Sequence, residues 1–296
     1  MPRVAFLGLG AIGAPMARNL ARRFDLAVWN RTTSRAVAFA SMHHGATQTR
    51  TPREAAEGRE IVVTCLPTSR EVAAVLEGRD GLLAGLEKGA LVVDCTSGDP
   101  ATSQQIAKRL AEHEVGFLDA PVSGGVSGAE QGTLTIMCGG SERAMQQAMP
   151  VLEAMGKKIV HCGPVGSGHA LKAVNNALLA VHLWATAEGL ATLKKAGVAP
   201  AVALDVINAS SGRSNASMNL FPERVLSRAF PRTFRLSLLD KDVAIAATVA
   251  RDQHVPSPMI QLAAELFRAA HHTLGDDADH VEAVRVVEQS AGVEIA

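Results

Sequence analysis

The start of the sequence constrains the fold more than any other part. An apolar run at residues 4–7 leads directly into the loop Gly8-Leu9-Gly10-Ala11-Ile12-Gly13, and a helical pattern follows. Gly8 permits a tight turn, Gly10 lets the backbone approach a pyrophosphate, and Gly13 lets the helix pack on the strand. The helix start offers its N–H groups to an anion. This order of strand, loop and helix predicts a dinucleotide site along all six loop residues.

The residues after the second expected strand bear on the choice of dinucleotide. Residues 26–29 form that strand, and Asn30-Arg31-Thr32 follows it where NAD-specific folds usually place an acid for the ribose hydroxyls. Asn30 can still bond a ribose, and the planar fork of Arg31 suits a 2′-phosphate. The alternative is that Arg31 is only a solvated residue after a strand. We expect NADP as the cofactor, with NAD as the alternative.

Two further strands, at residues 61–65 and 91–94, end in loops that are expected along the cofactor. Ligands of an open parallel sheet lie outside the carboxyl ends of its strands. The loops that follow contain Leu66 and Pro67 in one case and Thr96 and Ser97 in the other. Helix capping is the alternative role for the two hydroxyl residues.

A candidate anion loop follows the strand that ends near Asp119. Ser123-Gly124-Gly125 places two adjacent glycines after a serine, and such backbone can turn successive N–H groups toward a carboxylate. Taken alone, these three residues usually form an ordinary turn.

A loop and helix start at residues 163–169 lead into a long apolar segment that reads without a helix breaker to Gly197. Its apolar residues occupy nearly every side of a helix, so we expect burial around most of its circumference. Lys172 and Asn176 lie four residues apart and therefore on one face, with Asn175 beside them. A lysine that snorkels to solvent is the common explanation of such a position. A lysine in a buried helix is otherwise costly unless it has a partner or a chemical role.

Beyond this segment, strands no longer alternate with helices. Helical periodicity recurs at residues 200–209, 236–249, 258–274 and 280–289. The predicted fold class is therefore α/β, a Rossmann-type doubly wound, mostly parallel sheet followed by an all-α C-terminal domain, joined by a long helix. We place the dinucleotide-binding domain at residues 1–163 and the helical substrate and oligomerisation domain at residues 164–296.

Composition excludes several classes of protein. The 296 residues carry a formal net charge of +0, without the basic stripe and interleaved aromatics of a nucleic-acid-binding protein. The four cysteines lie far apart with no Cys-x-x-Cys spacing, so we expect buried reduced thiols and no metal site. No apolar run approaches membrane-spanning length and the N-terminus lacks a signal-peptide pattern, so we expect a cytoplasmic protein without a membrane partner.

With these segments placed, the sequence resembles the β-hydroxyacid dehydrogenase family, and within it the 3-hydroxyisobutyrate dehydrogenases. The resemblance covers essentially the whole chain and keeps the order of several motifs. They are the glycine loop continued by Ala14-Pro15-Met16, Leu66-Pro67, Asp119-Ala120-Pro121-Val122-Ser123-Gly124-Gly125, Gly166-Ser167-Gly168 with Lys172 and Asn176, and Lys241-Asp242. The absence of an acid at residues 30–32 departs from many NAD-using members and resembles NADP-using relatives.

The resemblance implies roles for these residues. It makes Lys172 the catalytic lysine, Asn176 a residue that holds the substrate, and the Ser123-Gly124-Gly125 loop the carboxylate site. The Lys241-Asp242 pair closes over the site, so we expect both residues at the substrate and Lys241 also at the cofactor. Asn175 is a further candidate for hydrogen bonds to the substrate.

The expected reaction is reversible oxidation of 3-hydroxyisobutyrate, or a close short 3-hydroxy acid, to the semialdehyde, a step of valine catabolism in that family. Because no metal spacing is present, Lys172 is the natural group to exchange the hydroxyl proton. Tartronate semialdehyde, succinic semialdehyde and glyoxylate are alternative substrates. A phosphosugar dehydrogenase and a non-catalytic cofactor-binding module are further alternatives. We expect a homodimer or homotetramer, because the stretch from Ala244 to Ala250 lacks strong amphipathicity.

Overall fold

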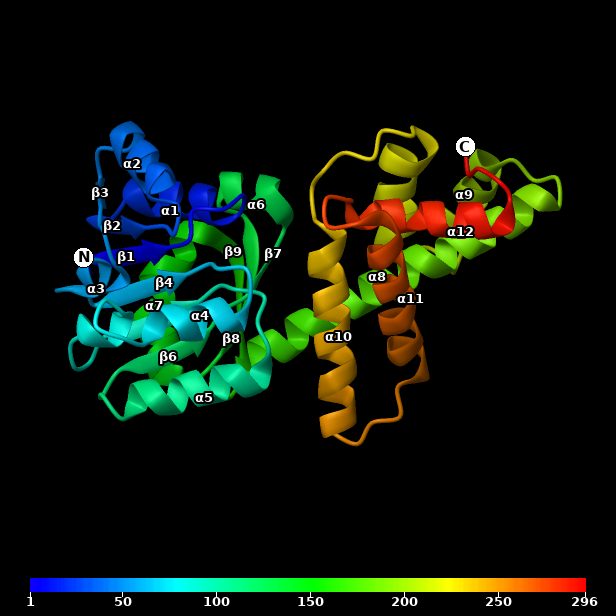
Figure 1. Cartoon of the computed structure of the whole chain (residues 1–296). Coiled ribbons are helices and arrows are strands. Elements are labelled where there is room, and N and C mark those ends of the chain that lie inside the picture. The colour runs from blue at the N-terminus through cyan, green and yellow to red at the C-terminus, as the bar shows by residue number, and fades with distance from the viewer. The chain divides into compact units, whose positions relative to one another are not determined.

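The structure, a computed structural model, describes all residues 1–296 and divides into two compact units, Met1–Lys172 and Ala173–Ala296. One helix, α8 (Ser167–Lys195), begins in the first unit and continues into the second. The boundary that the sequence predicts after residue 163 precedes this division, at the point where the last strand of the first unit ends. The elements are labelled in Figure 1.

The first unit is built on one sheet of nine strands in the order β3-β2-β1-β4-β5-β6-β8-β7, with β9 paired to β8. Strands β1 to β6 pair in parallel, whereas β8 runs antiparallel to β6 and β7 and parallel to β9. A mostly parallel Rossmann-type sheet is therefore confirmed. The strands are β1 Val4–Leu7, β2 Leu26–Trp29, β3 Ala46–Gln48, β4 Ile61–Thr64, β5 Leu91–Asp94, β6 Gly116–Asp119, β7 Val122–Ser123, β8 Leu134–Gly139 and β9 Gly156–Gly163.

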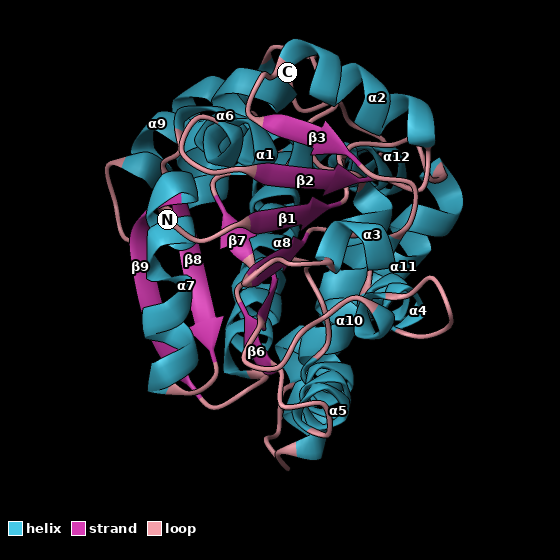
Figure 2. Ribbon diagram, turned by 90° about the vertical axis from the view of Figure 1, so that its left-hand side faces the viewer, coloured by secondary structure: helices cyan, strands magenta, loops and turns pink.

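Helices cover both faces of this sheet, because successive strand side chains alternate between the faces. Side chains such as Phe6 and Val28 form one core with helices α1, α2, α6 and α7, while Leu7 and Val92 form a second core with α3, α4 and α5. Figure 2 shows β1, β2 and β3 side by side in this unit. The helices are α1 Gly13–Ala21, α2 Thr33–Met42, α3 Pro52–Ala56, α4 Ser69–Leu76, η1 Leu82–Ala84, α5 Pro100–Ala111, α6 Gly125–Gln131 and α7 Glu142–Met155.

The carboxyl ends of the central strands are in register. Leu7 of β1 lies opposite Thr64 of β4, Thr64 lies opposite Asp94 of β5, and Asp94 lies opposite Asp119 of β6. The strand order reverses between β1 and β4, which is the place where a doubly wound sheet binds its ligand. The glycine loop follows β1 directly, so the sequence places it at this switch point.

The second unit is all-helical, as predicted. Large apolar side chains, among them Phe221, Phe267 and Leu239, form its single core. Helices α10 and α11 run side by side in Figure 1 and share this core. Besides α8, the unit contains α9 Pro200–Asn208, η2 Ala216–Leu226, α10 Leu236–Asp252, α11 Pro258–Leu274, η3 His280–Ala283 and α12 Val284–Ala291.

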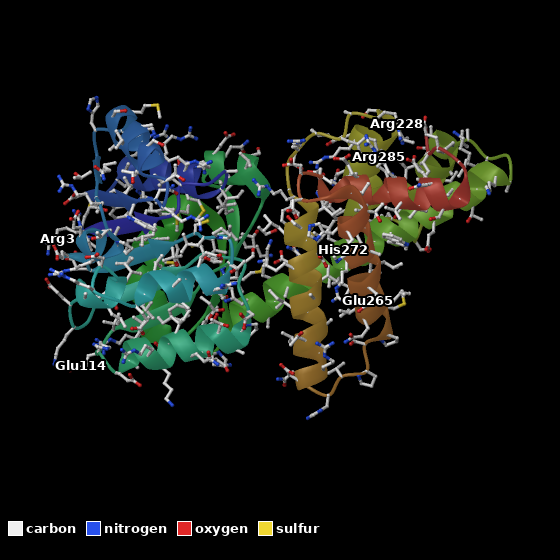
Figure 3. All side chains as sticks on the ribbon, viewed as in Figure 1. Arg3, Glu114, Arg228, Glu265, His272 and Arg285 are labelled. Atoms are coloured by element: carbon white, nitrogen blue, oxygen red, sulfur yellow. The ribbon has the colours of Figure 1, made fainter.

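Two features of this unit were not predicted. Segment η2 is a π-helix of 11 residues that contains Pro222, whose missing N–H removes one hydrogen bond of a regular α-helix. The chain end is also fixed, because Glu288 accepts a hydrogen bond from the Ile295 N–H at 2.7 Å and pairs with Arg228. Arg228 and Arg285, labelled in Figure 3, both lie against the ring of Phe230.

The expectation that α8 is buried around most of its circumference is wrong. The buried residues of α8 lie on one stripe that includes Ala177, Leu183 and Leu190, while Leu171 and Leu178 are 45% and 49% exposed. Alanines such as Ala177 fill much of the contact with the core together with Leu183 and Leu190, so Leu171 and Leu178 lie outside the stripe. In α10, Ala246 and Ala247 pack in the core of their own unit, and the oligomeric state stays a prediction. None of the helices is long and apolar enough to cross a bilayer.

Candidate active site

The glycine loop after β1 has the close packing that its motif requires. Gly8 has a φ of +106°, and a Cβ there would overlap the carbonyl oxygen of Cys65. A Cβ on Gly13 would overlap the carbonyl oxygen of Gly8, so helix α1 starts directly against the loop. A Cβ on Gly10 would meet nothing within 4 Å, which leaves open space beside the backbone. The loop therefore fits the pyrophosphate of a dinucleotide at the N-terminus of α1.

The side chain of Asn30, which follows β2, is hydrogen-bonded to this loop. Its Oδ1 accepts a hydrogen bond from the Leu9 N–H at 2.9 Å, and its Nδ2 donates to the Thr32 carbonyl at 3.1 Å. Arg31 and Thr32 are exposed at the start of α2. The amide of Asn30 thus has a structural function in the loop, and its contact with a ribose stays a prediction.

The loops after β4 and β5 are joined by Thr96. The Thr96 hydroxyl accepts from the Leu66 N–H at 3.0 Å, and the Thr96 N–H donates to Asp94 Oδ1 at 3.1 Å. The same carboxylate oxygen accepts from the Thr64 hydroxyl at 2.8 Å. Thr96 is buried and Pro67 is exposed, so of the residues predicted along the cofactor here, Thr96 holds the two loops together.

Two buried groups that the sequence did not assign lie beside these loops. Asp119 ends β6 and accepts hydrogen bonds from the backbone N–H groups of Gly166 and His169, where α8 begins. The His169 ring is completely buried between the Thr96 carbonyl and the Ser103 hydroxyl. Burial raises the pKa of Asp119, while His169 and the two N–H donors oppose this shift. An acid at the end of a buried strand and a histidine in the first turn of a mostly apolar helix are the signals that could have identified both.

The predicted carboxylate loop spans a strand end and a helix start. Ser123 is the last residue of β7, and Gly125 is the first residue of the seven-residue α6. Gly124 and Gly125 have φ values of +133° and +63°, a backbone region that strongly favours glycine. Both glycines are exposed, so the two glycine positions are required by the turn and remain accessible.

Lys172 and Asn176 both lie on α8, one turn apart. Lys172 is partly buried and Asn176 is 4% exposed. The Asn176 amide nitrogen donates to Asp242 Oδ2 at 2.6 Å, and the Asn175 amide donates to Asn176 Oδ1 at 3.2 Å. Lys241 Nζ lies 3.0 Å from Asp242 Oδ1. The structure therefore brings together Asn175, Asn176, Lys241 and Asp242, four residues predicted for the site.

The cysteines are all free thiols. Burial raises the pKa of the Cys65 and Cys138 thiols to about 12, so neither is a thiolate near neutral pH. No cluster of three or more His, Cys, Asp or Glu side chains is arranged to hold a metal ion.

Two families of known proteins match the two parts of the chain. Residues 3–163 match the family described as the NAD binding domain of 6-phosphogluconate dehydrogenase. Residues 166–287 match the family described as NAD-binding of NADP-dependent 3-hydroxyisobutyrate dehydrogenase.

Individual relatives cover nearly the full chain. The 2-(hydroxymethyl)glutarate dehydrogenase of Eubacterium barkeri is 35% identical over 294 residues, which are 99% of this chain and 97% of the relative. The 3-hydroxyisobutyrate dehydrogenase of Pseudomonas aeruginosa is 37% identical over 280 residues, 90% of this chain and 91% of the relative. A solved structure of Mycobacterium tuberculosis 3-hydroxyisobutyrate dehydrogenase with L-serine superimposes with a TM-score of 0.89 at 30% identity, covering 97% of this chain and 99% of that one. The chain thus belongs to the β-hydroxyacid dehydrogenase family, oxidoreductases that act on the CH–OH group of hydroxy acids with a nicotinamide cofactor.

Proposed function

We propose that this enzyme catalyses the reversible, NADP-dependent oxidation of 3-hydroxyisobutyrate, or a close short 3-hydroxy acid, to the semialdehyde. The observation that carries the proposal is the pair Lys172 and Asn176 on successive turns of α8, with Asn176 fixed by buried Asp242. An amine and an oriented amide one turn apart are suited to a hydroxyl that must lose a proton and keep its position.

Each residue has a defined part in this reaction. The exposed Gly124 and Gly125 with Ser123 hold the substrate carboxylate by hydrogen bonds from the backbone and the hydroxyl. Asn176 orients the substrate hydroxyl, and Lys172 Nζ takes its proton on oxidation and returns it on reduction. Bound nicotinamide supplies the hydride chemistry at the carbinol carbon. Lys241 pairs with Asp242 and contributes a positive charge beside the anionic substrate and cofactor.

The substrate class follows from a shared chemical group. 3-Hydroxyisobutyrate, 2-(hydroxymethyl)glutarate and L-serine, which the relatives' names mention, all have a CH₂OH group on the carbon that carries a carboxylate. We place 3-hydroxyisobutyrate first, because the relatives named above include 3-hydroxyisobutyrate dehydrogenases. We place L-serine second, because one of these relatives has been solved with L-serine. Glycerate, the reduced form of tartronate semialdehyde, has the same group. Succinic semialdehyde and glyoxylate yield hydroxy acids without it.

NADP is favoured by the groups at the start of α2. Arg31 and Arg35 are exposed there, and no acid stands between residues 30 and 35 to repel a 2′-phosphate. The first turn of α2 adds N–H groups at the positive end of the helix dipole. NAD is the alternative cofactor.

Initial rates on a matched panel test this function. The panel contains 3-hydroxyisobutyrate, L-serine, glycerate, 2-(hydroxymethyl)glutarate, 4-hydroxybutyrate and glycolate, each with NADP and with NAD at equal low concentration. We expect the fastest rate with 3-hydroxyisobutyrate and NADP, and the hydroxymethyl acids ahead of 4-hydroxybutyrate and glycolate. Isobutanol, which has the alcohol without the carboxylate, is the control. A fastest rate with glycolate or 4-hydroxybutyrate would overturn the substrate class.

Two broader proposals accompany this function. Leu171 and Leu178 on α8 and Met259 and Leu262 on α11 are exposed apolar side chains, as expected for the surface of a homodimer or homotetramer. Light scattering that gives a monomer at working concentration would contradict it. Four free thiols agree with a reducing compartment, and we propose the cytoplasm.

A further inference from the structure

The first turn of α8 is held by groups from three parts of the first unit, which are the Asp119 carboxylate, the Thr96 carbonyl and the Ser103 hydroxyl. This turn begins at Ser167 and precedes Lys172, the proposed proton acceptor, by about one helical turn. The side chains of Asp119, Ser103 and His169 are buried, and the contacts described below are with other groups of the first unit. Because these groups hold the first turn of α8, they affect the position of Lys172 in the next turn.

The first attachment is the carboxylate of Asp119. Its Oδ1 accepts from the Gly166 N–H at 2.7 Å and its Oδ2 from the His169 N–H at 2.9 Å. A Cβ on Gly168 would overlap the Met137 carbonyl oxygen and lie 2.8 Å from Asp119 Oδ2. Glycine at position 168 therefore lets α8 start in direct contact with β8 and with the carboxylate. A negative charge at this helix end is also favourable to the helix dipole.

The second attachment is the ring of His169. Its Nε2 lies 2.8 Å from the Thr96 carbonyl oxygen, which can only accept, so Nε2 carries the hydrogen. Its Nδ1 lies 2.6 Å from the Ser103 hydroxyl on α5. Asp94 Oδ2, a buried oxygen without a hydrogen-bond partner, lies 3.9 Å from Nε2 and favours a polarised N–H there. The ring is thus fixed in position, with Nε2 as a hydrogen-bond donor.

Both attachments connect α8 to loops of the proposed site. Thr96 holds the Leu66 loop, which is predicted along the cofactor. Asp119 lies four residues before Ser123, where the predicted carboxylate loop starts. We propose that Asp119 and His169 are positioning residues, which fix Lys172 relative to the carboxylate loop and the cofactor loops respectively. This inference rests on the proposed function, because it assigns the two residues an effect on the reaction through Lys172.

A double-mutant cycle separates positioning from general stability. Single-turnover oxidation of 3-hydroxyisobutyrate at saturating NADP is measured for wild type, His169→Leu, Lys172→Ala and the double variant. A misplaced catalytic group costs up to about 100-fold in rate, so we expect His169→Leu to lower the rate about 10- to 100-fold. In the Lys172→Ala background the same change should alter the residual rate less than about 2-fold, because the group it positions is gone. An equal loss in both backgrounds, or no loss in either, would overturn the inference.

Conservative variants keep the test valid if His169→Leu does not fold. His169→Gln keeps an amide donor for the Thr96 carbonyl and should restore most of the rate. Ser103→Ala removes the partner of Nδ1 and should give a smaller loss with the same dependence on Lys172.

Asp119→Asn should lower kcat and also raise KM for the hydroxy acid, whereas His169→Leu should lower kcat with little change in KM. Equal effects of these two variants on KM would show that Asp119 does not position Lys172 relative to the carboxylate loop.

The second unit offers a matched control. His280 is also a buried histidine and contacts the Phe234 carbonyl at 3.2 Å, far along the chain from Lys172. His280→Leu should lower the melting temperature and leave kcat unchanged.

If wild type oxidises no acid of the panel, the proposed function fails. If Lys172→Ala keeps the wild-type rate, the lysine assignment fails. If wild type oxidises an acid of the panel and Lys172→Ala loses turnover, but His169→Leu lowers the rate equally with and without Lys172, only the positioning inference fails.

Discussion

The amide nitrogen of Asn176 donates a hydrogen bond of 2.6 Å to a carboxylate oxygen of Asp242, and both side chains are at least nine-tenths buried. The other oxygen of Asp242 lies 3.0 Å from the ammonium of Lys241. A buried carboxylate is stable when both of its oxygens are paired in this way. Asp242 therefore orients two residues of the proposed site at once.

Asp242→Asn should separate this orienting effect from folding. The substituted amide has one acceptor oxygen, so either Asn176 or Lys241 loses its acceptor and faces an NH₂ group. We expect kcat/KM for the hydroxy acid to fall about 10- to 100-fold, in line with the effect of a displaced binding group. Asp205→Asn, on the exposed side of α9, is the control and should behave as wild type. Unchanged kinetics for Asp242→Asn would show that Asn176 keeps its position unaided.

Replacement of Lys172 tests the proton acceptor. Lys172→Ala should keep cofactor binding, measured by NADPH fluorescence, and lose about 10²- to 10⁴-fold in turnover, the usual contribution of a general base. Lys172→Arg should be similarly slow, because a guanidinium does not release its proton at working pH. Lys195→Ala, at the exposed far end of α8, is the control. Turnover near wild type for Lys172→Ala would remove the lysine from the mechanism.

Arg31 should determine the preference between the two cofactors. Arg31→Ala removes a bidentate partner for a 2′-phosphate and leaves the glycine loop intact. We expect KM for NADP to rise about 10-fold or more and KM for NAD to stay within about 2-fold, because a charged hydrogen bond contributes about 1.5–3 kcal/mol. Arg23→Ala, an exposed arginine beyond α1, controls for net charge. Equal effects on KM for both cofactors would show that Arg31 does not bind the 2′-phosphate.

His271 should make stability depend on pH. Its Nε2 lies 2.7 Å from Asp276 and its Nδ1 lies 2.9 Å from Asp240, the residue before Lys241. Hydrogen bonds to Asp276 and then to Asp240 raise the pKa of His271 above its usual value of 6.5. A raised pKa stabilises the fold below the unfolded-state pKa, and this stabilisation is lost as the pH rises through the folded-state value.

His271→Gln should therefore have its largest effect on the acid side. We expect the difference in melting temperature from wild type to be larger at about pH 6 than at about pH 9, because the stabilisation by the charged ring is lost as the pH rises through its folded-state pKa. His272→Gln, the exposed neighbour labelled in Figure 3, is the matched control and should show no such trend. A difference that grows with pH would contradict this assignment.

Local sequence signals predicted many of the elements accurately. Helix α11 spans Pro258–Leu274 as expected, because proline favours its first turn and Gly275 its end. The glycine loop was also predicted, since all of its requirements lie within one short stretch. By contrast, the π-helix η2 was missed because no simple periodicity marks it.

The parts of the candidate site that could not be predicted depend on residues far apart in the chain. Asp242 meets Asn176, and His169 meets Thr96, only after the helices and the sheet have formed. Composition gave the apolar character of α8 correctly, but not which side chains face the core. The positions of single groups thus follow from tertiary packing, which periodicity does not encode.

Helix α8 also limits how enzymes of this kind can be recombined. A chimera joined before Gly166 would take Asp119 from one parent and, from the other, residue 168, where a Cβ would overlap the Met137 carbonyl oxygen and crowd the carboxylate. A junction after Asn176 would instead divide the Asn176–Asp242 pair between parents. A junction between Lys172 and Asn176 would divide the proposed catalytic pair itself. The helix therefore has no neutral crossover point near its start, and exchange of either half requires that the partner residues be exchanged with it.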